Sequence, residues 1–283
     1  MIEEVRALLA RHLPSYEPRS VVALGAGLDH AAYEVDGRLV VRVRHPGGAR
    51  AEATGHEADL LALVAARSPV PVPRPVLVDP EAGAIAYEKL PGVPLLGCPV
   101  ADPTRATPAL GALLTALHRT DPAEAAHLVD RDDVPPADWL AEAAGHHRQV
   151  ADRLPPAARR RVEDFLASPP PPAPTALALC HNDLGAEHLL VDPATGTLTG
   201  VIDWADAAIT DPAVDLARVL RDLGGRALEA TLAHYEAPWT DADRERAAFY
   251  ARCALLEDLA YGLGEGPAVY AEAAMGNLDH TFA

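Results

Sequence analysis

The chain has 283 residues, of which 49% are hydrophobic, so it can build a core in more than one lobe and is not a disordered protein. A formal net charge of −17 excludes an extended nucleic-acid surface, because few basic side chains are available to neutralise phosphates. Three cysteines, Cys98, Cys180 and Cys253, are odd in number and lack Cys-x-x-Cys spacing, which argues against a disulfide framework and against a zinc site.

The first thirteen residues have the periodicity of an amphipathic helix. They lack the basic start and the long apolar stretch of a signal peptide. No apolar segment of the sequence reaches membrane-spanning length. We therefore expect a cytoplasmic protein that has no membrane partner and acts as a monomer.

Taken in chain order, the first ninety residues indicate a small β-rich lobe. Helical spacing of apolar residues predicts helices over 2–12 and 52–66. Asp36-Gly37 predicts a hairpin turn. Short apolar runs between turn residues predict five strands, over 21–24, 31–35, 39–43, 76–78 and 84–90.

The chain beyond Pro91-Gly92-Val93-Pro94 is mostly helical in pattern, apart from a proline-rich connector over 168–172. Apolar periodicity predicts helices over 104–119, 136–152, 157–167, 211–223, 226–236, 241–260 and 266–277. The predicted fold class is α+β, with a β-rich lobe over 1–90 and a helical lobe over 91–283.

The segment around His181 and Asp183 carries the most chemical information. An apolar run leads into this His-x-Asp turn, a second run leaves it, and a Pro-Ala-Thr-Gly turn precedes a third run; the runs cover 176–180, 189–191 and 198–202. Asp203 follows the third run, so two carboxylates are presented on adjacent loops. Phosphoryl transfer to a hydroxyl needs such a pair, one to accept the hydroxyl proton and one to hold Mg²⁺ against the nucleotide phosphates.

This segment resembles the H-R-D-x-x-x-x-N and D-F-G motifs of protein kinases, with His188 in place of the Asn and Trp-Ala after Asp203. Residues 199–216 are similar, nearly end to end, to the signature of the aminoglycoside phosphotransferase family. The motifs are closest to the 2″-aminoglycoside and macrolide kinases of that family. The resemblance extends over essentially the whole chain but is specific only over 180–216. It implies a two-lobed, protein-kinase-like fold.

The resemblance assigns roles in the second lobe. Asp183 is expected to be the general base, and Asp203 the principal Mg²⁺ ligand. His188 either binds the metal or holds the loop, since Mg²⁺ prefers oxygen to imidazole. His181 and Asp215 are expected to brace the catalytic loop. Further along, Asp211 with Pro212 indicates a helix N-terminus, and the role of Asp206 stays open.

In the first lobe, the resemblance implies a nucleotide site. Gly25 and Gly27 lie between two predicted strands, where backbone N–H groups could approach phosphate oxygens. Arg42 occupies the place of the lysine that usually contacts the α- and β-phosphates. Glu57 is its expected partner, with Glu52 as the alternative.

The segment that precedes the break, Tyr87 to Leu90, corresponds to the hinge between the lobes. Backbone groups of Glu88 and Leu90 are expected to bind the edge of the base. Backbone recognition does not distinguish adenine from guanine, so the nucleotide is ATP or GTP.

The acceptor site is predicted from Glu257 and Asp258, which resemble the acidic helix that binds cationic substrates in the 2″ kinases. A solvated, charged helix face is the alternative explanation. The net charge suits a cationic ligand, although an acidic surface also keeps a protein soluble.

The sequence thus predicts an antibiotic kinase that confers resistance, with an aminoglycoside as the first candidate acceptor and a macrolide as the second. Two alternatives remain. One is a metabolic or biosynthetic kinase acting on a sugar, an amino alcohol or an antibiotic intermediate. The other is a non-catalytic nucleotide-binding module.

Overall fold

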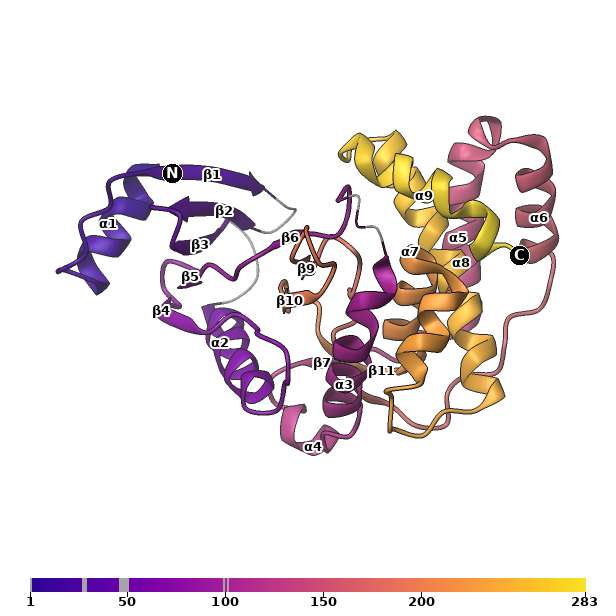
Figure 1. Ribbon diagram of the computed structural model, residues 1–283, viewed down its shortest axis with the longest axis horizontal. Helices are drawn as coiled ribbons and strands as arrows, with labels where there is room; N and C mark the ends of the chain where they lie inside the picture. Colours follow the sequence, from indigo (N-terminus) through magenta and orange to yellow (C-terminus); the bar gives the residue numbers. More distant parts are fainter. Residues whose placement is uncertain (1, 27–29, 46–50, 99, 101) are drawn as a thin grey trace. The chain divides into compact units, whose positions relative to one another are not determined.

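The computed structural model describes residues 2–26, 30–45, 51–98, 100 and 102–283 (Figure 1). The chain forms two compact units, Met1–Pro91 and Gly92–Ala283, which we call unit 1 and unit 2. Across these described ranges, no helix combines the length and the apolar composition that a membrane crossing needs.

The described residues of unit 1 form an antiparallel sheet and two helices, and the strands follow the spatial order β1-β2-β3-β5-β4. Its elements are α1 (Ile2–His12), β1 (Val21–Ala26), β2 (His30–Val35), β3 (Leu39–Arg44), α2 (Ala51–Ala65), β4 (Pro75–Asp79) and β5 (Ala84–Glu88). Both predicted helices and all five predicted strands are present, with ends shifted by up to two residues.

The core of unit 1 follows from the two-residue period of its strands. Ala31, Tyr33 and Val35 of β2 point to one face, where they form a cluster with Val41 of β3 and with Leu9 of α1. Helix α1 therefore covers this face of the sheet, and α2 contacts β4 and β5.

The turn between β2 and β3 shows how a local sequence sets the register of the sheet. Asp36 (φ 53°) and Gly37 (φ 67°) both adopt left-handed backbone, and the N–H of Arg38 donates to the carbonyl of Val35 (2.9 Å). Positive φ at both central residues is the geometry that Asp-Gly favours in a hairpin. The predicted hairpin turn is confirmed.

Unit 2 contains two small sheets, in the strand orders β10-β9-β6 and β7-β11-β8. Its strands are β6 (Val93–Pro94), β7 (Asp130–Arg131), β8 (Ala178–Cys180), β9 (Leu189–Val191), β10 (Leu198–Val201) and β11 (Ala208–Thr210). Its helices are η1 (Pro103–Ala106), α3 (Thr107–His118), α4 (Pro122–Ala125), α5 (Pro136–Val150), η2 (Ala151–Arg153), α6 (Pro156–Leu166), α7 (Ala213–Leu232), α8 (Asp241–Leu263) and α9 (Ala268–Thr281).

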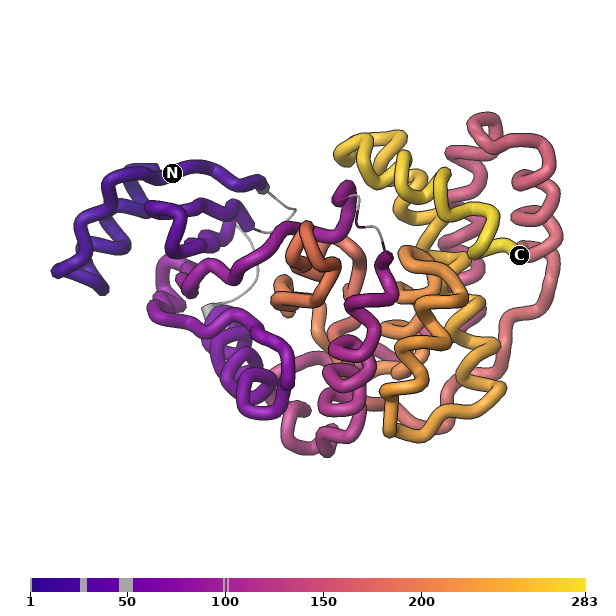
Figure 2. The backbone as a smooth tube through the Cα atoms, viewed as in Figure 1, coloured from indigo at the N-terminus to yellow at the C-terminus, as the bar shows by residue number. Residues whose placement is uncertain are grey.

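The long helices pack on one another behind the two small sheets. Helix α8 contacts α5, α7 and α9, and α3 contacts α7; Figure 2 shows the chain path through them. Leu255, Leu256 and Leu259 of α8 are fully buried in this packing. A capping box starts α8. The hydroxyl of Thr240 accepts from the backbone N–H of Asp243, and the backbone N–H of Thr240 donates to the carboxylate of Asp243.

The helices predicted separately over 211–223 and 226–236 are both present within α7, where a kink at Gly224 (φ 81°, ψ 173°) separates two helical stretches. One difference from the predicted helices has a physical cause. The helix predicted over 104–119 begins with the 3₁₀ turn η1, in which Asp102 accepts from the N–H of Thr104. The apolar periodicity continues through this local change of backbone.

Candidate active site

The turn over residues 181–183 of unit 2, which we call the catalytic turn after its predicted role, is fixed at its base by a single buried carboxylate. Asp215, near the start of α7, accepts from the backbone N–H of His181 (3.0 Å) and of Asn182 (2.8 Å). Asn182 has a φ of 69°, which few non-glycine residues adopt, so these two hydrogen bonds hold a strained turn. The prediction that Asp215 braces the loop is confirmed.

Asp215 is itself positioned by His118 and Tyr235, which the sequence did not reveal. Nε2 of His118 lies 3.2 Å from Asp215 Oδ2, and Nδ1 lies 2.7 Å from the hydroxyl of Tyr235. Burial alone would raise the pKa of Asp215, but the hydrogen bond from His118 and the neighbouring charges outweigh it and lower the pKa. Asp215 is therefore an ionised, acceptor-only anchor.

His181 also serves the loop. Its Nε2–H donates to the carbonyl of Ile202 (3.0 Å), and its buried ring packs against Trp204 at 4.6 Å between centroids. Burial lowers the pKa of His181, so the ring is neutral. These contacts confirm that His181 braces the loop and ties it to the end of β10.

His188 lies between Asp183, the predicted general base, and Asp203, the predicted metal ligand. Its Nδ1–H donates to the backbone carbonyl of Asp183 (2.8 Å) and lies 3.5 Å from Asp183 Oδ2. Its Nε2 lies 3.7 Å from Asp203 Oδ2. Asp203 lies two residues beyond the end of β10 and has a φ of 61°, a second strained residue at this site. The fold therefore brings Asp183, His188 and Asp203 together.

Opposing effects set the charges of this group. Burial would raise the pKa of Asp183, but Arg218 and His188 outweigh it and lower the pKa, so the carboxylate is ionised. Burial would lower the pKa of His188, but Asp183, Glu187 and Asp203 together raise it. The neighbouring carboxylates therefore stabilise the protonated form of His188.

This donor set fits a magnesium ion at Asp203 better than at His188. Mg²⁺ prefers carboxylate oxygen, and the side chain of Asp203 is 40% exposed. His188 already donates from Nδ1, and its raised pKa favours an ion pair over metal binding. Glu187 is a further candidate ligand, because its carboxylate lies within 4.8 Å of ligand atoms of Asp183 and His188.

A second charged cluster lies on the next turns of α7. The buried guanidinium of Arg221 pairs with Asp222 (2.7 Å) and with Asp258 of α8 (2.9 Å), and lies 3.9 Å from Glu187. Burial raises the pKa of Asp258 to about 7, although Arg221 opposes this shift. Glu257, the other predicted acceptor residue, is exposed.

In unit 1, the predicted ion pair is present: Nη1 of Arg42 donates to Glu57 Oε1 (2.7 Å), and both side chains are about nine-tenths buried. Nδ1 of His30 lies 3.5 Å from the same guanidinium. The side chain of the alternative partner, Glu52, lies outside the described residues.

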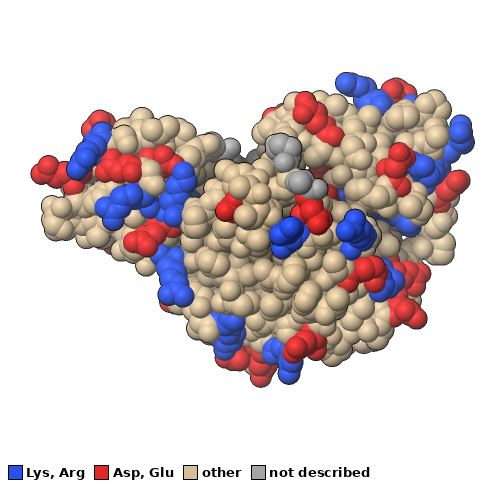
Figure 3. Space-filling model, viewed as in Figure 1, with Lys and Arg blue, Asp and Glu red and all other residues tan. Residues whose placement is uncertain are grey.

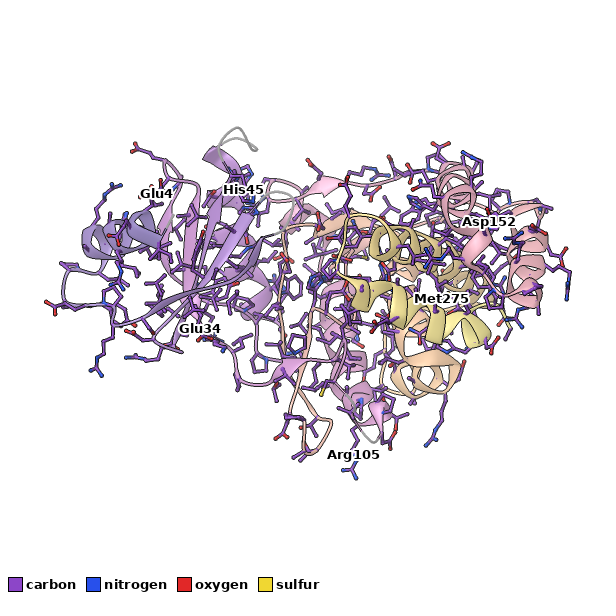
Figure 4. All side chains as sticks on the ribbon, turned by 90° about the horizontal axis from the view of Figure 1, so that it is seen from above. Glu4, Glu34, His45, Arg105, Asp152 and Met275 are labelled. Carbon is purple, nitrogen blue, oxygen red and sulfur yellow. The ribbon has the colours of Figure 1, made fainter. Side chains whose placement is uncertain are left out.

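The remaining nucleotide residues are placed as follows. Gly25 lies at a register shift between β1 and β2, with open space where a Cβ would be, and Gly27 lies outside the described residues. Glu88 ends β5 and is exposed, and Leu90 immediately precedes the boundary of unit 1. Between them, Lys89 pairs with Glu34, which Figure 4 labels on β2.

These features are those of a kinase-like phosphotransferase. The phosphotransferase enzyme family APH matches residues 3–250, and the chain belongs to this family. Its fold resembles that of an aminoglycoside 2″-phosphotransferase of type IIIa in complex with GDP and kanamycin (22% identity, TM-score 0.73, 98% of both chains covered). It also resembles the apoenzyme of macrolide 2′-phosphotransferase from Brachybacterium faecium (28% identity, TM-score 0.64, 98% of both chains).

A third relative is similar over a shorter stretch. Viomycin phosphotransferase from Streptomyces vinaceus is 31% identical over 103 residues. The match spans 36% of each chain, so it covers about a third of that relative's length. The predicted protein-kinase-like α+β fold is confirmed by the structural matches, and the predicted enzyme class, a phosphotransferase, by the family assignment.

Proposed function

We propose that the protein transfers the γ-phosphoryl group of ATP or GTP to a hydroxyl of an antibiotic. The observation that carries this proposal is the group in unit 2, where Asp183 and Asp203 lie on either side of His188. We assign nucleotide binding to unit 1, through the Arg42–Glu57 pair, and catalysis and acceptor binding to unit 2.

Each residue has a defined task in this scheme. Asp183 orients the acceptor hydroxyl and takes its proton as the oxygen attacks the γ-phosphorus. His188 keeps the two carboxylates apart and compensates their charge. Asp215 fixes the peptide that carries Asp183 through its bonds to His181 and Asn182.

Asp203 is the residue that we expect to hold Mg²⁺. A bound ion would supply charge neutralisation at the nucleotide phosphates. We assign Arg42 of unit 1 to a contact with nucleotide phosphate, since a guanidinium can bind phosphate oxygens.

An antibiotic acceptor is supported by the relatives, whose names include aminoglycoside, macrolide and viomycin phosphotransferases. We place an aminoglycoside first and a macrolide second, because the net charge of −17 favours a cationic acceptor and Glu257 is available on an exposed face. Such a transfer would confer resistance, since a phosphate adds negative charge and bulk to the drug.

The test is a panel of acceptors with Mg²⁺ and either ATP or GTP. It includes kanamycin, a macrolide, viomycin, simple sugars and amino alcohols, with nucleotide turnover and mass spectrometry as readouts. A phosphorylated antibiotic, absent with Asp183→Asn, supports the proposal, and reduced drug susceptibility of a host that expresses the protein supports resistance. A phosphorylated sugar or amino alcohol with unmodified antibiotics would instead support a metabolic kinase. Nucleotide binding without metal-dependent turnover would support a non-catalytic module.

A further inference from the structure

Arg218, one turn beyond Asp215 on α7, is a buried cation whose side chain is only 10% exposed. Its Nη2 lies 3.9 Å from Asp183 Oδ1, which is too far for a hydrogen bond. Its Nε is buried and has no hydrogen-bond partner, and within the described part of the chain the guanidinium donates no hydrogen bond at all. A buried donor left in this state costs free energy, so it calls for a functional explanation.

Two neighbouring buried arginines show what a structural role looks like in this fold. Arg221 donates to both carboxylate oxygens of Asp222 (2.7 and 2.9 Å) and pairs with Asp258. Arg246 donates to Asp211 (2.6 Å) and pairs with Asp243. Both guanidinium groups are satisfied by carboxylates in contact with them. Arg218 differs because its nearest ion-pair partner, Asp183 Oδ1, lies 3.9 Å from Nη2, beyond hydrogen-bond distance.

The two oxygens of Asp183 face different partners. Oδ2 lies near His188, and Oδ1 faces Arg218. An acceptor hydroxyl bound to Oδ1 would sit about 2.7 Å from it, in the space beside the guanidinium. The phosphorus that bonds to this hydroxyl oxygen brings its non-bridging oxygens to the same place. Nη2 of Arg218 thus lies beside the place where this scheme brings phosphoryl charge.

We propose that Arg218 is a catalytic residue that binds the phosphoryl group during its transfer, an inference that rests on the proposed function and deepens it. In the step, the acceptor oxygen bonds to the γ-phosphorus and the bond from that phosphorus to the β–γ bridging oxygen breaks. The hydroxyl proton passes to Asp183, and the nucleoside diphosphate leaves. Arg218 donates hydrogen bonds to the phosphoryl oxygens, where a planar fork matches their geometry.

The first experiment measures binding with a mimic of the phosphoryl group in transfer. ADP or GDP is titrated into the protein with Mg²⁺, with and without aluminium fluoride, by calorimetry. In the wild type, fluoride should tighten diphosphate binding. In Arg218→Ala we expect this tightening to fall about a hundredfold, while the affinity for diphosphate alone stays within about twofold. Arg226→Ala is the matched control, because Arg226 is an exposed arginine on the same helix.

The second experiment measures turnover. Arg218→Ala should lower kcat about a hundredfold, both for transfer to the acceptor and for slow hydrolysis of the nucleotide without acceptor, with little change in either KM. Added guanidinium ion should restore part of the loss, which a purely structural role would not allow. If Arg218→Ala does not fold, Arg218→Gln decides the question with the same two readouts.

Three results would overturn the proposal. One is full fluoride-dependent tightening in the folded Arg218 variants. Another is a raised KM for the acceptor with unchanged hydrolysis, which would assign Arg218 to acceptor binding. A third is a wild type without nucleotide turnover, which would remove the proposed function as well, whereas the first two leave it standing.

Discussion

Asp183 has an ionised carboxylate because its cationic neighbours outweigh its burial, and this suits a group that must accept a proton. Asp183→Asn keeps the shape of the side chain and removes the base. We expect nucleotide affinity to stay within about twofold while kcat falls roughly two to four decades, the usual contribution of a positioned base. Steady-state kinetics on the phosphorylated acceptor measure both quantities.

Asp203→Asn provides the comparison, since Asp203 is assigned to the metal. It should weaken binding of the metal–nucleotide complex and lower turnover together. If Asp183→Asn kept near-normal kcat on the true acceptor, the assignment of the base would be wrong.

Arg42 and Glu57 form a buried pair in unit 1, in which Nη1 of Arg42 donates to Glu57 Oε1 at 2.7 Å. Arg42→Ala removes this cation beside a buried carboxylate, so the free energy of unfolding should fall by about 3 kcal/mol. The apparent KM for nucleotide should rise as well. Arg42→Lys keeps the charge, so it should lower the free energy of unfolding less and raise the KM for nucleotide less than Arg42→Ala does. Chemical denaturation and nucleotide titration test this, and an unchanged nucleotide KM in Arg42→Ala would shift the phosphate contact to another residue.

Asp258 gives a prediction about pH. Burial raises its pKa in the folded protein to about 7, above the value of about 3.9 expected in the unfolded chain. Between these values the folded state binds a proton that the unfolded state does not, so this group makes stability fall as pH rises from about 4 to 7. The stability of Asp258→Asn relative to the wild type should therefore increase as pH rises from about 4 to 7, and should not increase further above pH 7. Urea denaturation curves of both proteins at several pH values measure the difference in their free energies of unfolding. This difference would not change with pH if Asp258 were already ionised at low pH.

The residues that sequence could identify are those whose roles follow from motif and strand order. Asp183 and Asp203 follow short apolar runs. Arg42 lies on a predicted strand and Glu57 on the helix that follows it, so the two side chains could meet. His118 and Arg218 could not be found in this way, because their roles depend on the packing of α3 and α7 behind the loop. One signal was available: Arg218 lies three residues after Asp215, so both share the helix face that looks towards the catalytic turn.

At the scale of elements, the bend in α7 gives a matched pair of substitutions. Gly224 has a φ of 81°, and its neighbour Gly225 does not adopt left-handed backbone and has open space where a Cβ would lie. Gly224→Ala should cost about 1–2 kcal/mol, because a Cβ is strained at this φ. Gly225→Ala should be neutral or stabilise by up to about 1 kcal/mol. Thermal unfolding of both variants checks this, and equal effects would mean that the bend is not set by Gly224.

The elements that sequence missed are the short ones. Strands β6, β7 and β11 have only two or three residues, too few to show a two-residue period. Their pairing depends on tertiary contacts, as in β6, where the backbone at Gly92 (φ 103°) passes so close to β9 that a Cβ would meet the carbonyl of Val191. The longer helices and the five strands of unit 1 have enough residues for periodicity to reveal them.

At the scale of the whole molecule, the net charge of −17 reflects an excess of acidic over basic side chains. On the face shown in Figure 3, acidic and basic side chains are interspersed, and Arg105 of η1 projects outward in Figure 4. Within unit 2, several acids near the catalytic turn are neutralised by Arg218 and Arg221. Attraction of a cationic acceptor therefore depends on which acids remain exposed, and Glu257 is one of them.

Glu257→Gln tests whether the acceptor is polycationic. If it is, the apparent KM for the acceptor should rise by up to about fivefold, the effect of about 0.2–1 kcal/mol from one exposed charge, and the KM for nucleotide should not change. The rise should shrink with added salt, because exposed charges are screened over about 8–10 Å at ~0.1–0.15 M ionic strength. Glu245→Gln is the control, since it changes the net charge equally from an exposed position nearer the start of α8. Equal effects of the two variants would indicate general attraction by the acidic molecule. No effect of either, at any salt concentration, would count against an aminoglycoside and favour an acceptor with little or no charge.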